Sequence, residues 1–104
     1  MVFKCCQKGS IIQKNIRILK KDLEVLNDEN RLRILCLLRN HIELCVCEIY
    51  KALDLSQNLV SYHLGKLKKA GFIESKKNGA KVIYSQGYKK MEKFQSIINN
   101  LISK

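Results

Sequence analysis

Four of the five cysteines in this sequence form two close pairs, and thiol groups are the side chains here best suited to binding a soft metal ion. Cys5 and Cys6 are adjacent, and Cys45 and Cys47 are separated by one residue. Thiolates within reach of one another select thiophilic ions over hard ones. We therefore take Cys5, Cys6, Cys45 and Cys47 as the candidate metal ligands.

The second pair lies where a helix is predicted to begin, at about Val46. Side chains at positions i and i+2 of a regular helix point about 200° apart, so Cys45 and Cys47 converge on one ion only if Cys45 precedes the helix. A helix N-terminus also lowers the pKa of a nearby thiol and favours the thiolate. The position of this pair is therefore compatible with metal binding, although a Cys-x-Cys pair is a weak signal and buried cysteines are common.

The remaining cysteine and both histidines fit other roles. Cys36 lies in an apolar segment and is predicted to pack in the core. His41 and His63 are isolated in the sequence, which argues against a harder metal site. An odd number of thiols without a secretory signal argues against a disulfide framework, so metal binding, redox sensing and burial remain open.

A second kind of chemistry is indicated by the segment from Gln57 to about Ala70. On a helical wheel at about 100° per residue, Val60, Leu64 and Leu67 share one side. The opposite side is small, polar and rich in hydrogen-bond donors, the composition needed to read base edges in the major groove. Its members are Asn58, Ser61, Tyr62, Gly65 and Lys69, whereas His63 falls on the flank and is expected to pack or hydrogen-bond.

Positive charge is concentrated in and after the same segment. The chain has a formal net charge of +11, and residues 64–81 contain six lysines and a single glutamate. Such a field attracts polyanions, and phosphate contacts supply most of the affinity in DNA binding. The candidate DNA-contacting residues are Gln57, Asn58, Ser61, Tyr62, Lys66, Lys69, Lys76, Lys77 and Lys81.

The elements that position these residues can be predicted from periodicity and end signals. Amphipathic helices are expected over residues 11–27, from Asp28, over 46–53, from the Ser56 cap to 70, and from Tyr88 onward. Gly71 ends the fourth helix, and two β-prone runs flank Asn78-Gly79, a strong signal for a type I′ hairpin turn. The fold class is mainly α with a β-hairpin, a winged helix-turn-helix of order ααααββα. We expect residues 1–10 to form a cysteine-containing arm and residues 11–104 to form the winged helix-turn-helix DNA-binding domain.

These segments resemble the ArsR/SmtB family of metal-responsive winged-helix repressors. The resemblance rests on Leu26–Leu35, on Glu43–Glu48, on Ser56–Leu64, and on Gly71–Ile73 with the Tyr84 strand. It implies a homodimer through the first and last helices and an operator with two half-sites. It also implies repression in the free state and release of double-stranded DNA when a metal binds.

The departures from the family pattern limit the choice of metal site. Arsenic sensors with three cysteines in this segment carry the third at the position of Tyr50, and the last helix lacks the Asp and His ligands of the zinc-sensing branch. The remaining resemblance is to members that complete the site from an N-terminal arm. An adjacent pair such as Cys5-Cys6 favours As(III) or Sb(III), whereas retention of both Cys45 and Cys47 suits Cd(II), Pb(II) or Zn(II) as the second choice.

Two alternative functions stay open, whereas neither catalysis nor an organic cofactor is expected. The cysteines could form a disulfide or polysulfide switch, or the chain could be a thiolate metal buffer without a DNA role. No Ser-His-Asp set, phosphate-binding glycine loop or paired catalytic carboxylates occur in the sequence, so neither an enzyme nor an organic cofactor is expected. No apolar run approaches the length that spans a bilayer, so we expect a cytoplasmic protein without a membrane partner.

Overall fold

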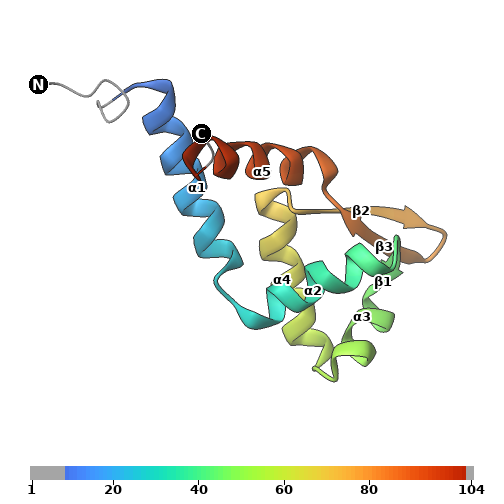
Figure 1. Ribbon diagram of the computed structural model, residues 1–104. Helices are drawn as coiled ribbons and strands as arrows, with labels where there is room; N and C mark the ends of the chain where they lie inside the picture. The colour runs from blue at the N-terminus through green and yellow to red at the C-terminus, as the bar shows by residue number, and fades with distance from the viewer. Residues whose placement is uncertain (1–8, 103–104) are drawn as a thin grey trace, which may run out of the picture.

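The computed structural model describes residues 9–102, which form five helices and three strands (Figure 1). The order along the chain confirms the predicted winged helix-turn-helix, with one short strand in addition. The helices are α1 (Ile11–Leu26), α2 (Glu29–Asn40), α3 (Val46–Leu53), α4 (Gln57–Ala70) and α5 (Tyr88–Ile102). The strands are β1 (Leu44–Cys45), β2 (Ile73–Asn78) and β3 (Lys81–Gln86).

The additional strand β1 joins the hairpin, so the sheet has the antiparallel order β1-β3-β2. Cys45 and Lys76 both pair with Ile83, from opposite sides of β3. One rung of the sheet therefore runs from a candidate metal ligand to a candidate DNA contact. A strand of two residues is too short to produce a period in the sequence, which is why it was not predicted.

The hairpin turn lies one residue later than predicted. Asn78 still pairs with Lys81, so the two turn residues are Gly79 and Ala80. Gly79 has φ 68, and within residues 9–102 the only non-glycine residue with positive φ is Asp54. The predicted type I′ turn with Asn78 at positive φ was therefore wrong. Positive φ falls only on the first turn residue, as in a type II′ turn, and glycine adopts it without a Cβ clash.

Two side-chain caps and a glycine set the ends of α2 and α4, as predicted. The side chain of Asp28 accepts from the backbone N–H of Arg31 at 3.1 Å and begins α2. Ser56 accepts from the N–H of Leu59 at 3.2 Å and begins α4. Gly71 ends α4 in the left-handed region at φ 88, a conformation that favours glycine.

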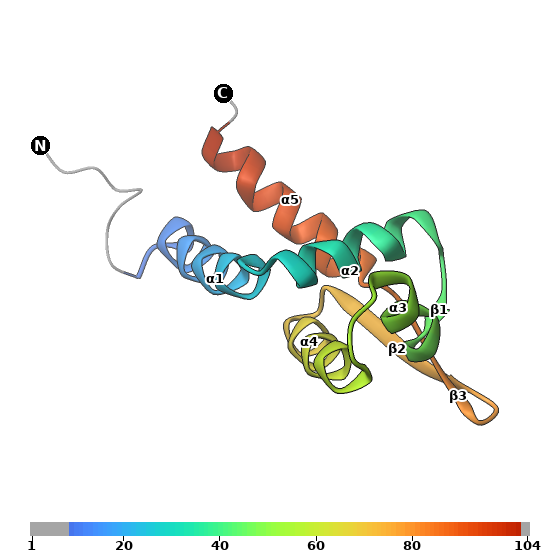
Figure 2. The ribbon, with the colours of Figure 1, turned by 90° about the horizontal axis from the view of Figure 1, so that it is seen from below.

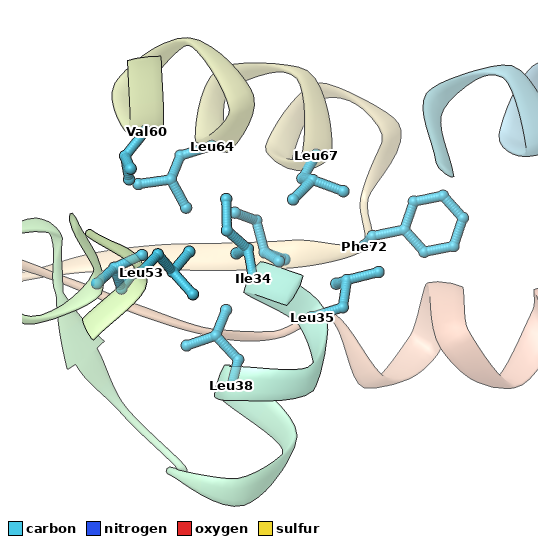
Figure 3. Packing of buried hydrophobic residues seen from close by; sticks show 10 residues of the cluster. Ile34, Leu35, Leu38, Leu53, Val60, Leu64, Leu67 and Phe72 are labelled. Atoms are coloured by element: carbon cyan, nitrogen blue, oxygen red, sulfur yellow. The ribbon is translucent and has the colours of Figure 1, made fainter. Parts of the chain in front are cut away.

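The core lies between α2, α3, α4 and the start of β2. The labelled side chains of α2, α3 and α4 point toward one another (Figure 3), whereas Phe72 points away from them and its ring meets that of Phe94 edge-on at 5.5 Å. The predicted inner face of α4 is confirmed, because its three apolar residues are at most 1% exposed. The buried cluster comprises Ile34, Leu35, Leu38, Ile49, Leu53, Val60, Leu64, Leu67, Phe72 and Ile73. This packing fixes the opposite side of α4 toward solvent.

The prediction that Cys36 packs in the core was wrong, because its side chain is exposed. Ile34, Leu35 and Leu38 form the buried side of α2, and Cys36 lies on the opposite side of the helical wheel. Its sulfur instead lies 3.7 Å from the Asn40 Nδ2 atom. The core therefore covers only one side of α2, although apolar residues occur on both sides of this helix.

Helices α1 and α5 extend away from the sheet and pack on each other (Figure 2). An ion pair joins them, with Lys90 Nζ 2.9 Å from the buried Asp22 carboxylate. Several apolar side chains of both helices face solvent, including Ile12 at 46%, Leu23 at 48% and Leu101 at 50% exposure. Within the described residues, no helix combines the length and apolar character needed to cross a membrane.

Candidate nucleic-acid interface and thiol site

The candidate base-reading residues lie together on the solvent side of α4. The packing of the inner face leaves six of the predicted side chains exposed along the other side of the helix. They are Gln57, Asn58, Ser61, Tyr62, Lys66 and Lys69. The arrangement offers amide, hydroxyl and ammonium donors on one convex surface, which is the chemistry that hydrogen-bonds to base edges and phosphates.

Tyr62 is the largest side chain on this surface, with 54% of its area exposed. Two cations flank its ring, because Arg31 Cζ lies 5.8 Å and Lys66 Nζ 5.5 Å from the ring centroid. The ring of His63 meets it edge-on at 5.4 Å. These contacts flank the Tyr62 ring on the outer side of α4, where more than half of the side chain is open to solvent.

His63 is buried beneath this surface, with 4% of its area exposed. Its Nδ1 atom accepts a hydrogen bond from Arg31 Nε at 3.0 Å, and its Nε2 atom lies 3.9 Å from Asp28 Oδ1. The expectation that His63 packs and hydrogen-bonds is therefore confirmed. The backbone N–H of Arg31 donates to the Asp28 carboxylate and holds the pKa of Asp28 below its usual value.

Sequence reasoning did not single out Arg31. The available signal was a cation on the first turn of α2, facing the predicted core rather than solvent. Its guanidinium also donates from Nη1 to the carbonyl oxygen of Val25 at 3.0 Å, near the end of α1. Arg31, which lies on α2, therefore contacts both α1 and α4.

The wing presents its three predicted cations to solvent. Lys76 and Lys77 lie on β2 and Lys81 begins β3, around the turn, and all three are exposed. Lys76 Nζ forms an ion pair with Glu43 Oε2 at 2.8 Å. One wing cation therefore already has a partner in the segment that leads into the cysteine pair.

Cys45 lies outside the helix, as the geometry of the pair requires. It is both the second residue of β1 and the N-cap of α3, with extended backbone at φ −83 and ψ 165. Its backbone N–H donates to Glu48 Oε1 at 3.0 Å, which lowers the pKa of Glu48. Cys45 is 8% exposed, whereas Cys47 is half-buried on the first turn.

A hollow of about 570 Å³ separates this cysteine pair from the tip of the wing. It is lined by residues 45–48 on one side and by 80–82 on the other. A hydrogen bond to the Cys47 sulfur raises the pKa of Lys51, one turn further along α3. A ligand on the two sulfurs would therefore lie between the start of α3 and the wing.

The described residues supply two thiols to this site and no further ligand. No group of three or more Cys, His, Asp or Glu side chains that could hold a metal ion occurs within residues 9–102. Cys5 and Cys6 lie outside the described residues, so their approach to Cys45 and Cys47 stays a prediction. A thiol pair alone falls short of the three or four ligands that a closed thiolate site needs.

Comparison with known proteins covers both the cysteine pair and the outward face of α4. A family model described as "Bacterial regulatory protein, arsR family" matches residues 28–75. The arsenical resistance operon repressor of Escherichia coli strain K12 is 37% identical, over 75% of this chain and 80% of that protein. The chain belongs to the ArsR family. The match to the family model spans α2 to the start of β2, and so includes the cysteine pair and α4.

Further relatives and solved structures are also similar to this chain, in sequence or in fold. The cadmium resistance transcriptional regulatory protein CadC of Listeria innocua is 46% identical over 59% of this chain, and the alignment spans 51% of that relative's length. Reduced HlyU from Vibrio cholerae superposes with a TM-score of 0.69 at 30% identity, covering 89% of this chain and 97% of HlyU. The homodimeric winged helix-turn-helix domain Mb0332 from Mycobacterium bovis gives a TM-score of 0.71 at 20% identity, covering 95% and 94%, and supports the fold.

Proposed function

We propose that this ArsR-family protein is a transcriptional repressor that binds operator DNA and releases it when a thiophilic ion binds to its cysteines. The observation that carries the proposal is the outward face of α4, with its donors and cations held clear of the core. The wing lysines extend the same positive surface. Arg, Lys, amide and hydroxyl groups in this arrangement position a protein on phosphates and read bases.

The DNA-binding form in this proposal is a homodimer through α1 and α5. Exposed apolar side chains occur on both helices, and a groove of about 350 Å³ between them is lined mainly by Ile12, Ile16, Ile97 and Leu101. Contiguous apolar surface of this kind marks an interaction site. A two-fold dimer presents two copies of α4 to two half-sites, which a single copy cannot do.

The effector in this proposal is As(III) or Sb(III) first, and Cd(II), Pb(II) or Zn(II) second. The 1–10 arm would supply Cys5 and Cys6 to the pair at the start of α3. Relatives named for arsenical and for cadmium resistance support this range of ions. Soft thiolates at an N-cap, where the helix dipole favours negative charge, are suited to such ions.

Release would follow from the place of Cys45 in the fold. It is joined to β3 through β1 and to α3 as its N-cap, so an ion that ties it to the arm acts on the wing and on the first helix of the helix-turn-helix pair together. The dimer would then favour a spacing of its α4 helices that does not fit the operator. Linkage requires DNA to weaken ion binding by the same factor, typically about 5–150-fold.

The proposal is tested by titrating operator release with arsenite, cadmium and zinc under reducing conditions, with the bound ion counted per dimer. We expect stoichiometric release that is lost in Cys45→Ser and retained in Cys36→Ser, a matched control because Cys36 is exposed on the far side of α2. Release by an oxidant in chelated, ion-free buffer would instead support the redox switch. Absence of salt-sensitive DNA affinity would contradict the proposal as a whole.

A further inference from the structure

The side chain of Arg31 connects the end of α1 to the outward face of α4. Its Nη1 atom donates to the Val25 carbonyl and its Nε atom donates to His63 Nδ1, both at 3.0 Å. Carbonyls in the last turn of a helix have no partner within the helix, so Val25 gains one from Arg31. One planar guanidinium therefore bridges α1 and α4 from the first turn of α2.

The contact with Arg31 determines both the tautomer and the orientation of the His63 ring. Because Nδ1 of His63 accepts from Arg31, a neutral imidazole in this contact carries its proton on Nε2. The ring is then held edge-on to Tyr62 at 5.4 Å, while the Arg31 guanidinium lies 5.8 Å from the centroid of the same Tyr62 ring. Arg31 thus acts on Tyr62 directly and through His63.

Lysine cannot reproduce these contacts. A guanidinium donates in two fixed directions and places a flat face against an aromatic ring at the same time, whereas an ammonium is a compact point charge. Arg31 uses two different nitrogens for its two hydrogen bonds, Nε to His63 and Nη1 to Val25, while its Cζ atom lies 5.8 Å from the centroid of the Tyr62 ring. The function of this residue therefore depends on its shape as well as its charge.

We propose that Arg31 is a positioning residue for sequence recognition, which sets the orientation of the Tyr62 ring on the outward face of α4. The inference rests on the proposed function, because it assigns Tyr62 to base reading. Base contacts tolerate little misplacement, so the loss of Arg31 affects specific binding more than phosphate binding.

The test compares Arg31→Lys with Arg33→Lys. Arg33 is a matched control, since it also lies on α2 but donates to a carbonyl of α3, that of Leu53 at 3.1 Å. For Arg31→Lys we expect the ratio of operator to non-specific DNA affinity to fall about tenfold, with the salt dependence unchanged because the charge is kept. For Arg33→Lys we expect less than a twofold change in that ratio.

A double-mutant cycle locates the effect. In a Tyr62→Ala background, Arg31→Lys should lower operator affinity by less than twofold further, because Arg31 acts through Tyr62. Independent, multiplicative effects of the two substitutions would overturn the inference. A parallel fall of operator and non-specific affinity in Arg31→Lys would also overturn it, because that result assigns Arg31 to direct phosphate contact.

Two further measurements separate this inference from the proposed function. Nitrogen NMR of the His63 ring in DNA-free protein should report the Nε2–H tautomer, and Arg31→Lys should convert it to a mixture. His63→Asn, whose Oδ1 can accept in place of Nδ1, should retain specificity that His63→Leu loses, even if Arg31→Lys does not fold. Failure of the wild-type protein to bind any operator would remove the proposed function, whereas wild-type specificity in Arg31→Lys would remove this inference alone.

Discussion

The outward face of α4 and the segment around Cys45 differ in how much of each site the described chain contains. The DNA surface is assembled within residues 57–81, on a capped helix and a closed hairpin. The thiol segment provides two sulfurs and needs further ligands. Many weak contacts to a long polyanion can be supplied by one rigid surface, whereas an ion at about 2.3 Å from each sulfur needs several ligands at one point.

The two regions are nevertheless connected through shared contacts. A substitution in one region therefore tests whether the other is affected. Glu43 pairs with Lys76, and Cys45 shares a rung with the same lysine through Ile83. The core beneath α4 also contains Ile49 of α3. The comparison therefore predicts which substitutions damage both regions and which damage one.

The largest effect is expected from the shared core. Leu64→Ala removes a side chain that is 1% exposed between α4 and its neighbours, and should lower the free energy of unfolding by about 2–5 kcal/mol. Urea unfolding followed by circular dichroism measures this change. Leu59→Ala, on the same helix at 38% exposure, is the control and should cost much less. Equal losses in the two variants would contradict the assignment of the inner face.

The next effect separates the regions. Cys47→Ser should reduce the ion-dependent change in operator affinity from the typical coupling of about 5–150-fold to nearly none, because the pair loses one soft ligand. Operator affinity without ion should stay within about twofold of the wild type, since Cys47 does not face the outward side of α4. Fluorescence anisotropy with and without arsenite gives both quantities. Retained release would show that the ion binds elsewhere.

A smaller effect concerns the wing. Lys77→Gln and Lys81→Gln should each reduce the slope of log affinity against log salt by about 0.9, the value for one phosphate contact. Lys76→Gln should change the slope less, because its ammonium is already paired with Glu43 at 2.8 Å. Binding isotherms over a salt series measure all three slopes. Equal slopes for the three variants would mean that the Glu43 pair is given up in the complex.

The smallest effect concerns pH. Because the pKa of Asp28 is lower in the folded state, its ionised form stabilises the fold at pH values above the ordinary carboxyl pKa of about 3.9. That contribution should be lost as the pH falls through the folded-state pKa. Asp28→Asn still caps α2 but does not titrate, so its deficit in unfolding free energy should be constant near neutral pH and shrink below about pH 4. A deficit that is independent of pH would contradict this assignment.

The sequence was sufficient for the features that depend on nearby residues. Ser56 begins α4 and Gly71 ends it, each through contacts with residues nearby in the sequence. The inner and outer faces of the helix between them follow from residue spacing alone. For the same reason Cys45 could be placed outside α3. The outward face of α4 could therefore be predicted residue by residue.

The features that were missed depend on distant partners. The exposure of Cys36 is decided by how many helices cover α2, and the role of Arg31 by a histidine 32 positions away. Strand β1 exists because β3 provides a pairing edge. The proposed approach of Cys5 and Cys6 to the thiol pair likewise depends on the path of the chain rather than on local pattern, and it stays a prediction.

The order of the strands places the lysines of β2 on an edge of the sheet. Since β2 lies at the edge of the sheet, one side of its backbone has no strand partner within the described chain. An unpaired edge is a template for strand pairing between molecules, and charged side chains along it oppose such pairing. We therefore expect Lys76 and Lys77, which both lie on β2, to oppose strand pairing between molecules at this edge. Neutralising both would be expected to produce aggregation at concentrations that the wild-type protein tolerates.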